Sequence, residues 1–255
     1  MKTRPADGAN RTGISTSPDG TQLAERAAID ACAEPSPDAE ELAAVRADYA
    51  RGAPPVGTVS PPATMKSAAK ATMEAINGNG ALAFLDLLGE RLAFERTGTR
   101  LYDALLVKVD GTAPRPGAPT REQLEEIRDD EARHLAVLGD AIESLGGDST
   151  AVTPSADVIS VAGSGWLQAL ADPRTTLTEA LKVVLAAELA DNDAWETLVD
   201  VAAGLHQEEL ADQFREAAVE EESHLARVRA WVTLAVAGQV GIAPPPLEDS
   251  DALAP

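Results

Sequence analysis

Apolar residues recur at the three- and four-residue spacing of an α-helix in four long segments of the chain. We predict helices over residues 81–109, 120–145, 176–203 and 207–237. Two of these segments open on a capping box, which pairs Thr120 with Gln123 and Thr176 with Glu179. No segment of the sequence shows the strict alternation of apolar and polar residues that marks a strand, so the pattern predicts an all-α fold.

The links between the four segments are unequal in length. Short links join the first helix to the second and the third to the fourth, whereas residues 146–174 separate the second from the third. Short links join antiparallel neighbours, and one long link lets the chain cross a whole bundle. We therefore predict a four-helix bundle with one long crossover, in which we place no helix, and we expect Gly238 to end the last helix.

The chain outside the four helices divides into an arm and a tail. Residues 1–61 are rich in Ala, Pro, Gly, Ser and Asp, and we expect an irregular, loosely ordered N-terminal arm. Short helices are predicted in the arm at 21–33 and 37–50, and another at 62–76. The predicted parts are the arm at 1–61, the bundle at 62–240 and a Pro-rich acidic tail at 241–255.

Composition supports close-packed helices and excludes some partners. Aromatic residues make up only 3% of the chain, so its core must consist mainly of Ala, Leu and Val. The net charge of −21 repels phosphate backbones and attracts cations, so we expect no nucleic-acid partner. We find no secretory signal and expect no membrane span. The single cysteine, Cys32, permits no internal disulfide, which fits the cytoplasm.

Two of the three histidines follow a glutamate by three residues, as Glu131-x-x-His134 and Glu221-x-x-His224. Each pair lies on one face of a predicted helix, and that face is the apolar one. A carboxylate and an imidazole are costly to bury unless something neutralises them, and a metal ion does so. The third histidine, His206, is expected at the surface, in the turn between the last two helices.

One glutamate lies on the apolar stripe of each of the other two helices. Glu95 precedes Tyr102 by seven residues, and Glu188 precedes Trp195 by the same interval. The order of lone glutamate, aromatic residue and Glu-x-x-His pair therefore occurs twice. This repeat indicates an internal duplication of a helix pair, with a pseudo-twofold axis through a shared site.

These motifs resemble those of the ferritin-like di-metal carboxylate proteins, the superfamily of bacterioferritin, rubrerythrin and the bacterial diiron oxygenases. The run from Asp130 to His134, Asp-Glu-Ala-Arg-His, is similar to a run in diiron oxygenases and desaturases. The resemblance covers residues 80–237 and implies a ferritin-like four-helix bundle with two metal ions. The implied ligands are Glu131 and Glu221 as bridges, Glu95 and Glu188 as terminal carboxylates, and His134 and His224, with Asp130 and Glu220 accepting the second imidazole N–H.

The resemblance implies a dinuclear oxidoreductase, with iron the leading metal and manganese an open choice. Its partners would be oxygen or peroxide and a small-molecule substrate, with a homodimer left open. Ferroxidase, peroxidase and oxygenase remain unresolved, and Tyr102 is the candidate catalytic side chain, as a hydrogen-bond donor or a redox-active group. The alternatives are a manganese catalase-like enzyme and a non-catalytic metal-binding or interaction bundle.

Three details qualify this expectation. There is no Cys-x-x-Cys pair, so the iron–thiolate domain of rubrerythrin is absent. Trp195 stands where the first half has Tyr102, and we expect core packing for it. Gly98 and Thr99 face Asp191 and Asn192, where small and polar residues fit either a pocket beside the metals or buried structural hydrogen bonds.

Overall fold

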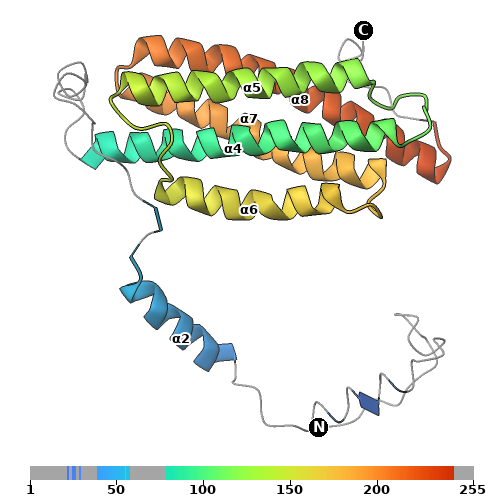
Figure 1. The fold of residues 1–255 in the computed structure, drawn as a ribbon, viewed down its shortest axis with the longest axis horizontal. Helices are drawn as coiled ribbons and strands as arrows, with labels where there is room; N and C mark the ends of the chain where they lie inside the picture. The colour runs from blue at the N-terminus through green and yellow to red at the C-terminus, as the bar shows by residue number, and fades with distance from the viewer. Residues whose placement is uncertain are drawn as a thin grey trace. The chain divides into compact units, whose positions relative to one another are not determined.

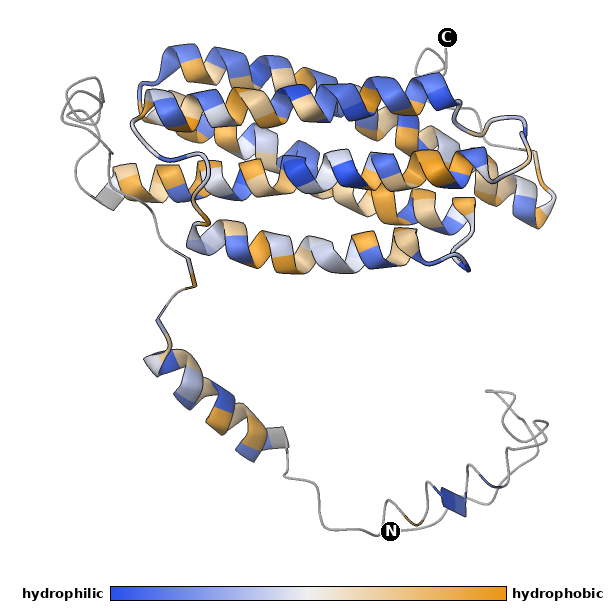
Figure 2. Cartoon of the chain, viewed as in Figure 1, coloured by the Kyte–Doolittle hydropathy of each residue, from blue (hydrophilic) through white to orange (hydrophobic). Residues whose placement is uncertain are grey.

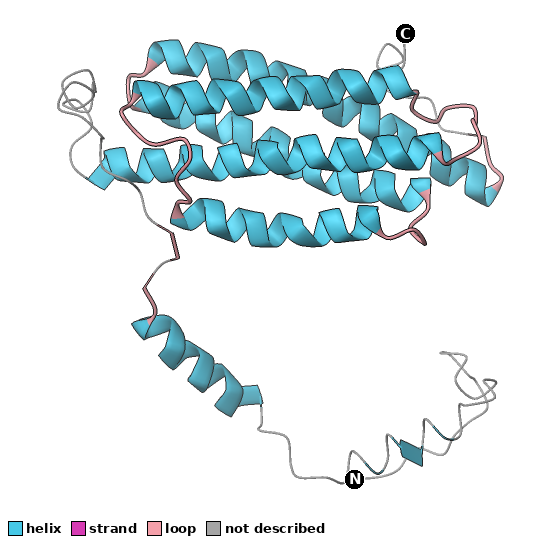
Figure 3. Ribbon diagram, viewed as in Figure 1, coloured by secondary structure: helices cyan, strands magenta, loops and turns pink. Residues whose placement is uncertain are grey.

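The computed structural model describes residues 39–54, 56–57 and 79–243, together with Gln22, Glu25, Arg26 and Ile29. The chain forms two compact units, Met1–Pro54 and Pro55–Pro255. Every regular element of the described residues is a helix, so the all-α prediction is confirmed for this part of the chain (Figure 3). Among these helices, none is both long and apolar enough to cross a membrane.

The first unit contains helix α2, Ala39–Gly52, which confirms the short helix predicted at 37–50 with a shift of two residues. Glu40 and Glu41 lie in its first turn, where acidic side chains favour the helix dipole. Of the helix predicted at 21–33, only Gln22, Glu25, Arg26 and Ile29 are described, and these are helical. The helix predicted at 62–76 lies outside the described residues.

The second unit contains the four long helices that the hydrophobic pattern predicts. They are α4 (Asn79–Asp110), α5 (Arg121–Ser144), α7 (Leu177–Gly204) and α8 (Glu208–Val240). Both predicted capping boxes are present, at the starts of α5 and α7. The predicted stop at Gly238 is wrong, because α8 continues to Val240 and ends where Gly241 takes a left-handed backbone conformation, with φ of 73°.

The predicted crossover contains a further helix, α6 (Pro154–Ala171), which the sequence analysis missed. Thr153 caps its first turn and Pro154 occupies the first helical position, where its missing N–H costs nothing. Asp86 of α4 accepts hydrogen bonds from the backbone N–H and the hydroxyl of Ser155 at 2.9 and 2.7 Å. This helix runs beside α4 and also contacts α7 (Figure 1).

The other main contacts join α4 to α5, α4 to α7, α5 to α8 and α7 to α8. Apolar and polar residues recur in successive turns of these helices (Figure 2). The buried apolar residues form two clusters. The Phe84 cluster includes Leu88, Leu138, Leu198 and Phe214, and the Leu105 cluster includes Phe94, Ile127, Leu181 and Val228.

The two clusters take opposite halves of each long helix. In α4 the Phe84 cluster reaches Leu92 and the Leu105 cluster begins at Phe94, and comparable divisions occur in α5, α7 and α8. Five of the six residues predicted to bind metal lie in these divisions of α5, α7 and α8, and Glu95 directly follows Phe94 on α4. The fold therefore places a polar group of side chains between two apolar layers.

Candidate metal centre

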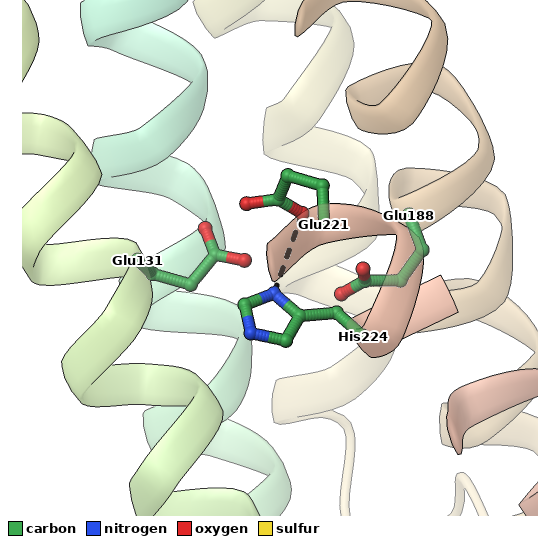
Figure 4. Close-up of side chains that lie close together, drawn as sticks. All are labelled: Glu131, Glu188, Glu221 and His224. Atoms are coloured by element: carbon green, nitrogen blue, oxygen red, sulfur yellow. Dashed lines mark ion pairs between the residues drawn. The ribbon is translucent and has the colours of Figure 1, made fainter. Parts of the chain in front are cut away.

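The six residues predicted as metal ligands are buried together between helices α4, α5, α7 and α8. Each is at most 3% exposed. Helices α4 and α7 supply one glutamate each, and α5 and α8 supply one Glu–His pair each. Four of these side chains are shown in Figure 4, where they point toward a common centre. The six residues are Glu95, Glu131, His134, Glu188, Glu221 and His224.

The potential ligand atoms form overlapping groups, within each of which all atoms lie within 4.8 Å of one another. One group has four members, Glu131, Glu188, Glu221 and His224. A second group consists of Glu95, His134 and Glu221. Because Glu221 belongs to both, the two groups are adjacent, and each combines the oxygen and nitrogen donors that suit iron, manganese or zinc.

Several inward atoms of these residues have no assigned hydrogen bond among the described residues. The histidine atoms among them still face a carboxylate, because His134 Nδ1 and His224 Nδ1 lie 2.7 and 3.4 Å from the oxygens of Glu221. Every one of the six residues contributes at least one such atom. A buried polar atom without a partner costs free energy, and native proteins contain few of them. Their concentration in one place is compatible with a group of residues that could hold a metal ion. The atoms are Glu95 Oε2, Glu131 Oε2, His134 Nδ1, Glu188 Oε2, both carboxylate oxygens of Glu221, and His224 Nδ1.

The Nε2 atom of each histidine lies within hydrogen-bond distance of a carboxylate on the facing helix, as predicted. His134 Nε2 lies 2.7 Å from Glu220 Oε2, and His224 Nε2 lies 3.1 Å from Asp130 Oδ2. Arg133 donates to both carboxylates, at 2.7 and 2.8 Å. Such contacts fix the ring orientation and leave Nδ1 of each histidine directed into the centre.

Two aromatic residues donate hydrogen bonds reciprocally to the lone glutamates of α4 and α7. Tyr102 of α4 donates its hydroxyl hydrogen to Glu188 Oε1 of α7. Trp195 of α7 donates from Nε1 to Glu95 Oε1 of α4 at 3.0 Å. Trp195 packs in the Phe84 cluster as expected, but it also has this polar contact, which the sequence analysis did not anticipate.

Sequence reasoning missed the role of Arg91, a buried arginine at the edge of the centre that is 2% exposed. Its guanidinium pairs with both Glu95 and Asp191. It also stacks over the ring of Phe94, 4.6 Å from the ring centroid. An arginine four residues before Glu95, on the same face of the helix, was the available signal.

Three of the four residues considered for a pocket beside the centre, Gly98, Thr99 and Asp191, contact other residues of the protein. Gly98 faces the carboxylate of Glu131, and a Cβ at position 98 would overlap Glu131 Oε2. The hydroxyl of Thr99 donates to the carbonyl of Glu95 at 3.0 Å, and Asp191 pairs with Arg91. The third histidine, His206, is exposed in the turn between α7 and α8, as predicted.

The crowded carboxylates and imidazoles shift one another's pKa values. Burial and the charge of Glu221 raise the pKa of Glu188 to about 8. Burial alone would also raise the pKa of Glu221, but contacts with His134 and His224 lower it to about 2. Burial lowers the pKa of His224, yet Asp130 and Glu221 outweigh this effect and raise it to about 10. In the metal-free protein, protons therefore supply part of the charge balance, and bound metal ions would displace them.

Comparison of the chain with protein-family models, with curated proteins and with solved structures gave no match. The geometry of the centre is therefore the basis for assigning a class and a function.

Proposed function

We propose that this chain is a ferritin-like dinuclear metalloprotein that uses two metal ions, most simply iron, to react with oxygen or peroxide. The observation that supports it best is the convergence of six buried residues with ligand spacing, among which Glu95 Oε2, Glu131 Oε2 and Glu188 Oε2 have no hydrogen-bond partner in the described part of the chain. When ionised, the four glutamates carry four negative charges, which two divalent ions balance. The donor set therefore fits two metal ions.

In this proposal, α4, α5, α7 and α8 are the four helices of the bundle, and α6 lies in its long crossover. Antiparallel pairs with short links, followed by a long link and a second pair, match the connection order of ferritin-like bundles. The repeat of Glu95, Tyr102 and Glu131 by Glu188, Trp195 and Glu221 supports two equivalent halves.

The chain's own residues would prepare the ligands. Glu131 and Glu221 would bridge the two ions, with Glu95 and His134 at one position and Glu188 and His224 at the other. Bound iron would supply reversible one-electron oxidation at each of two adjacent ions, which together deliver two electrons to a bound oxidant. Tyr102 holds Glu188 through a hydrogen bond and keeps a phenolic proton beside the centre.

Burial limits what can react at this centre. The six side chains are at most 3% exposed, and Glu131 fills the space above Gly98. A bulky organic substrate has no room at these atoms, whereas oxygen, peroxide and metal ions are small. We therefore favour ferroxidase, peroxidase or catalase chemistry over oxygenation of a large substrate. Manganese would fit the same donors and give the catalase-like alternative.

The test is metal stoichiometry. The full chain is purified aerobically, its metals are measured, and the metal-free protein is then reloaded anaerobically with ferrous iron. We expect two ions per chain, and consumption of oxygen or peroxide by the loaded protein. Native protein carrying two manganese ions would favour the catalase-like alternative.

The double substitution Glu131→Ala and Glu221→Ala should abolish binding of the ion pair. The matched control, Asp129→Ala and Glu222→Ala, removes the same charge from exposed positions of α5 and α8 and should keep two ions. Two ions in the bridging variant would refute the ligand assignment, and none in the parent protein would favour a non-catalytic bundle.

A further inference from the structure

The two halves of the repeated site differ in buried charge at two aligned positions. When Glu95 is aligned with Glu188, Arg91 corresponds to Val184 and Gly98 corresponds to Asp191. The first half therefore has an extra cation, and the second half has an extra carboxylate. In the structure these two residues form an ion pair with each other.

Asp191 lies among the potential metal ligands. One of its carboxylate oxygens lies within 4.8 Å of ligand atoms of Glu95, Glu131 and Glu221. It is 2% exposed, and its charge is balanced by Arg91, which also pairs with Glu95. This fifth carboxylate is thus on the Glu95 side of the centre although it extends from α7, the helix of Glu188.

The terminal glutamates of the two sides have different donors. Glu188 receives a hydrogen bond from the neutral hydroxyl of Tyr102. Glu95 is held by Trp195 and by the positive guanidinium of Arg91. A cation bonded to a carboxylate reduces the attraction of that carboxylate for a metal ion.

The number of donors also differs. The Glu188 side has four ligand atoms within reach of one another, from Glu131, Glu188, Glu221 and His224, whereas the Glu95 side has three with His134. The Glu95 side has one group of four donors, and that group does not contain His134. Its members are Glu95, Glu131, Asp191 and Glu221.

We infer that Asp191 is an additional metal-binding carboxylate of the Glu95 position, counterbalanced by Arg91, and that the two metal positions consequently differ in affinity. The Glu188 position fills first. The Glu95 position fills second, because its metal ion must compete with Arg91 and depends on the charge of Asp191. This inference rests on the proposed dinuclear function.

Removing either Arg91 or Asp191 changes the charge beside Glu95, whereas removing both does not. Without Asp191, the charge of Arg91 is left facing Glu95, which disfavours a second cation. Without Arg91, Asp191 becomes a buried unpaired charge, which is strongly destabilising in the metal-free protein. Removing both leaves no net change in charge and removes the difference in buried charge between the two halves.

The experiment is a titration of the metal-free full chain with Mn²⁺, followed by calorimetry and by electron paramagnetic resonance, which separates single from paired Mn²⁺ ions. For the parent protein we expect two binding steps whose dissociation constants differ by at least about tenfold. Asp191→Asn should weaken the second step by about tenfold or more and leave the first unchanged. Asp193→Asn, an exposed change on the same helix, should alter neither step.

The double variant Arg91→Val and Asp191→Gly gives each position the residue found at the aligned position of the other half. We expect its two dissociation constants to be more nearly equal than those of the parent protein. Thermal unfolding of each metal-free variant establishes that it is folded. Two equal steps in the parent protein, or an unchanged second step in Asp191→Asn, would overturn this inference and leave the dinuclear function intact. A parent protein that binds no Mn²⁺ and no Fe²⁺ would overturn both.

Discussion

Tyr102 and Glu188 lie 86 residues apart in the sequence and are joined by a hydrogen bond in the middle of the helices. Trp195 and Glu95, 100 residues apart, have the reciprocal contact. In each pair, an aromatic residue from one half of the repeated pattern donates to the lone glutamate of the other half. The two halves are therefore joined through the side chains that position the candidate ligands.

Tyr102→Phe should destabilise the metal-free protein. The substitution keeps the ring in the Leu105 cluster but leaves Glu188 Oε1 without its donor, and a buried acceptor without a partner costs about 1–3 kcal/mol. The measurement is urea unfolding in the presence of a chelator. Tyr49→Phe, an exposed change on α2, is the control and should leave the unfolding curve unchanged. Equal free energies of unfolding for Tyr102→Phe and Tyr49→Phe would show that the Tyr102 hydroxyl contributes nothing to stability.

Gly98→Ala should impair metal binding. Alanine normally stabilises the middle of a helix by about 0.5–1 kcal/mol relative to glycine, but here its Cβ overlaps the carboxylate of Glu131 and must displace it. We expect the number of Mn²⁺ ions bound per chain to fall. Gly165→Ala, on α6 with open space around the position, should raise the unfolding temperature and leave metal content unchanged. Full metal content in Gly98→Ala would argue against Glu131 as a ligand.

Asp130→Ala should weaken metal binding without removing a ligand. Asp130 Oδ2 lies 3.1 Å from His224 Nε2 and fixes the ring with Nδ1 facing inward. Loss of such a contact typically lowers metal affinity by about 10- to 100-fold. Asp129→Ala, its exposed neighbour, is the control for charge. The affinities come from the same Mn²⁺ titration, and equal values for the two variants would count against this role of Asp130.

Asp86→Ala should destabilise the protein at neutral pH, and the loss should shrink in acid. Burial raises the pKa of Asp86, but hydrogen bonds from Ser155 and Thr153 outweigh it and place the pKa below its ordinary value of 3.8. The carboxylate therefore stabilises the folded state above the unfolded pKa, and this stabilisation is lost as pH falls through the folded pKa. Loss of its bonds at the start of α6 should cost about 1 kcal/mol. Denaturant unfolding of both proteins at pH 7 and pH 3 measures the difference, and a difference independent of pH would exclude the ionised form as its source.

The four long helices and the convergence of the six residues were predictable because both depend on local spacing. Glutamate and histidine three residues apart share a helix face wherever the helix lies, and the apolar neighbours of Glu131 and Glu221 indicate that the face is buried. Helix α6 was less visible, because its sequence is rich in Ser, Ala and Gly and gives a weak periodic signal. Only its capping Thr153 and the following Pro154 marked its start.

The contacts of Arg91 were not predictable from spacing alone. A charged residue on an apolar helix face can reach the surface along its own stem or can find a partner inside the fold, and local sequence does not decide between these outcomes. The partner, Asp191, is 100 residues away on another helix. Gly98 is similar, because the reason for a glycine there is a carboxylate supplied by α5.

The separation of the apolar core into the Phe84 and Leu105 clusters has a consequence for local unfolding. An ordinary helix frays from its ends, where backbone hydrogen bonds are fewest. In the metal-free protein, we expect the crowded, buried polar side chains between the two clusters to weaken the central turns of α4, α5, α7 and α8 instead. Amide hydrogens of these central turns should exchange with deuterium faster than those beside either cluster. Metal binding should slow that exchange and turn two independently opening halves into one cooperative unit.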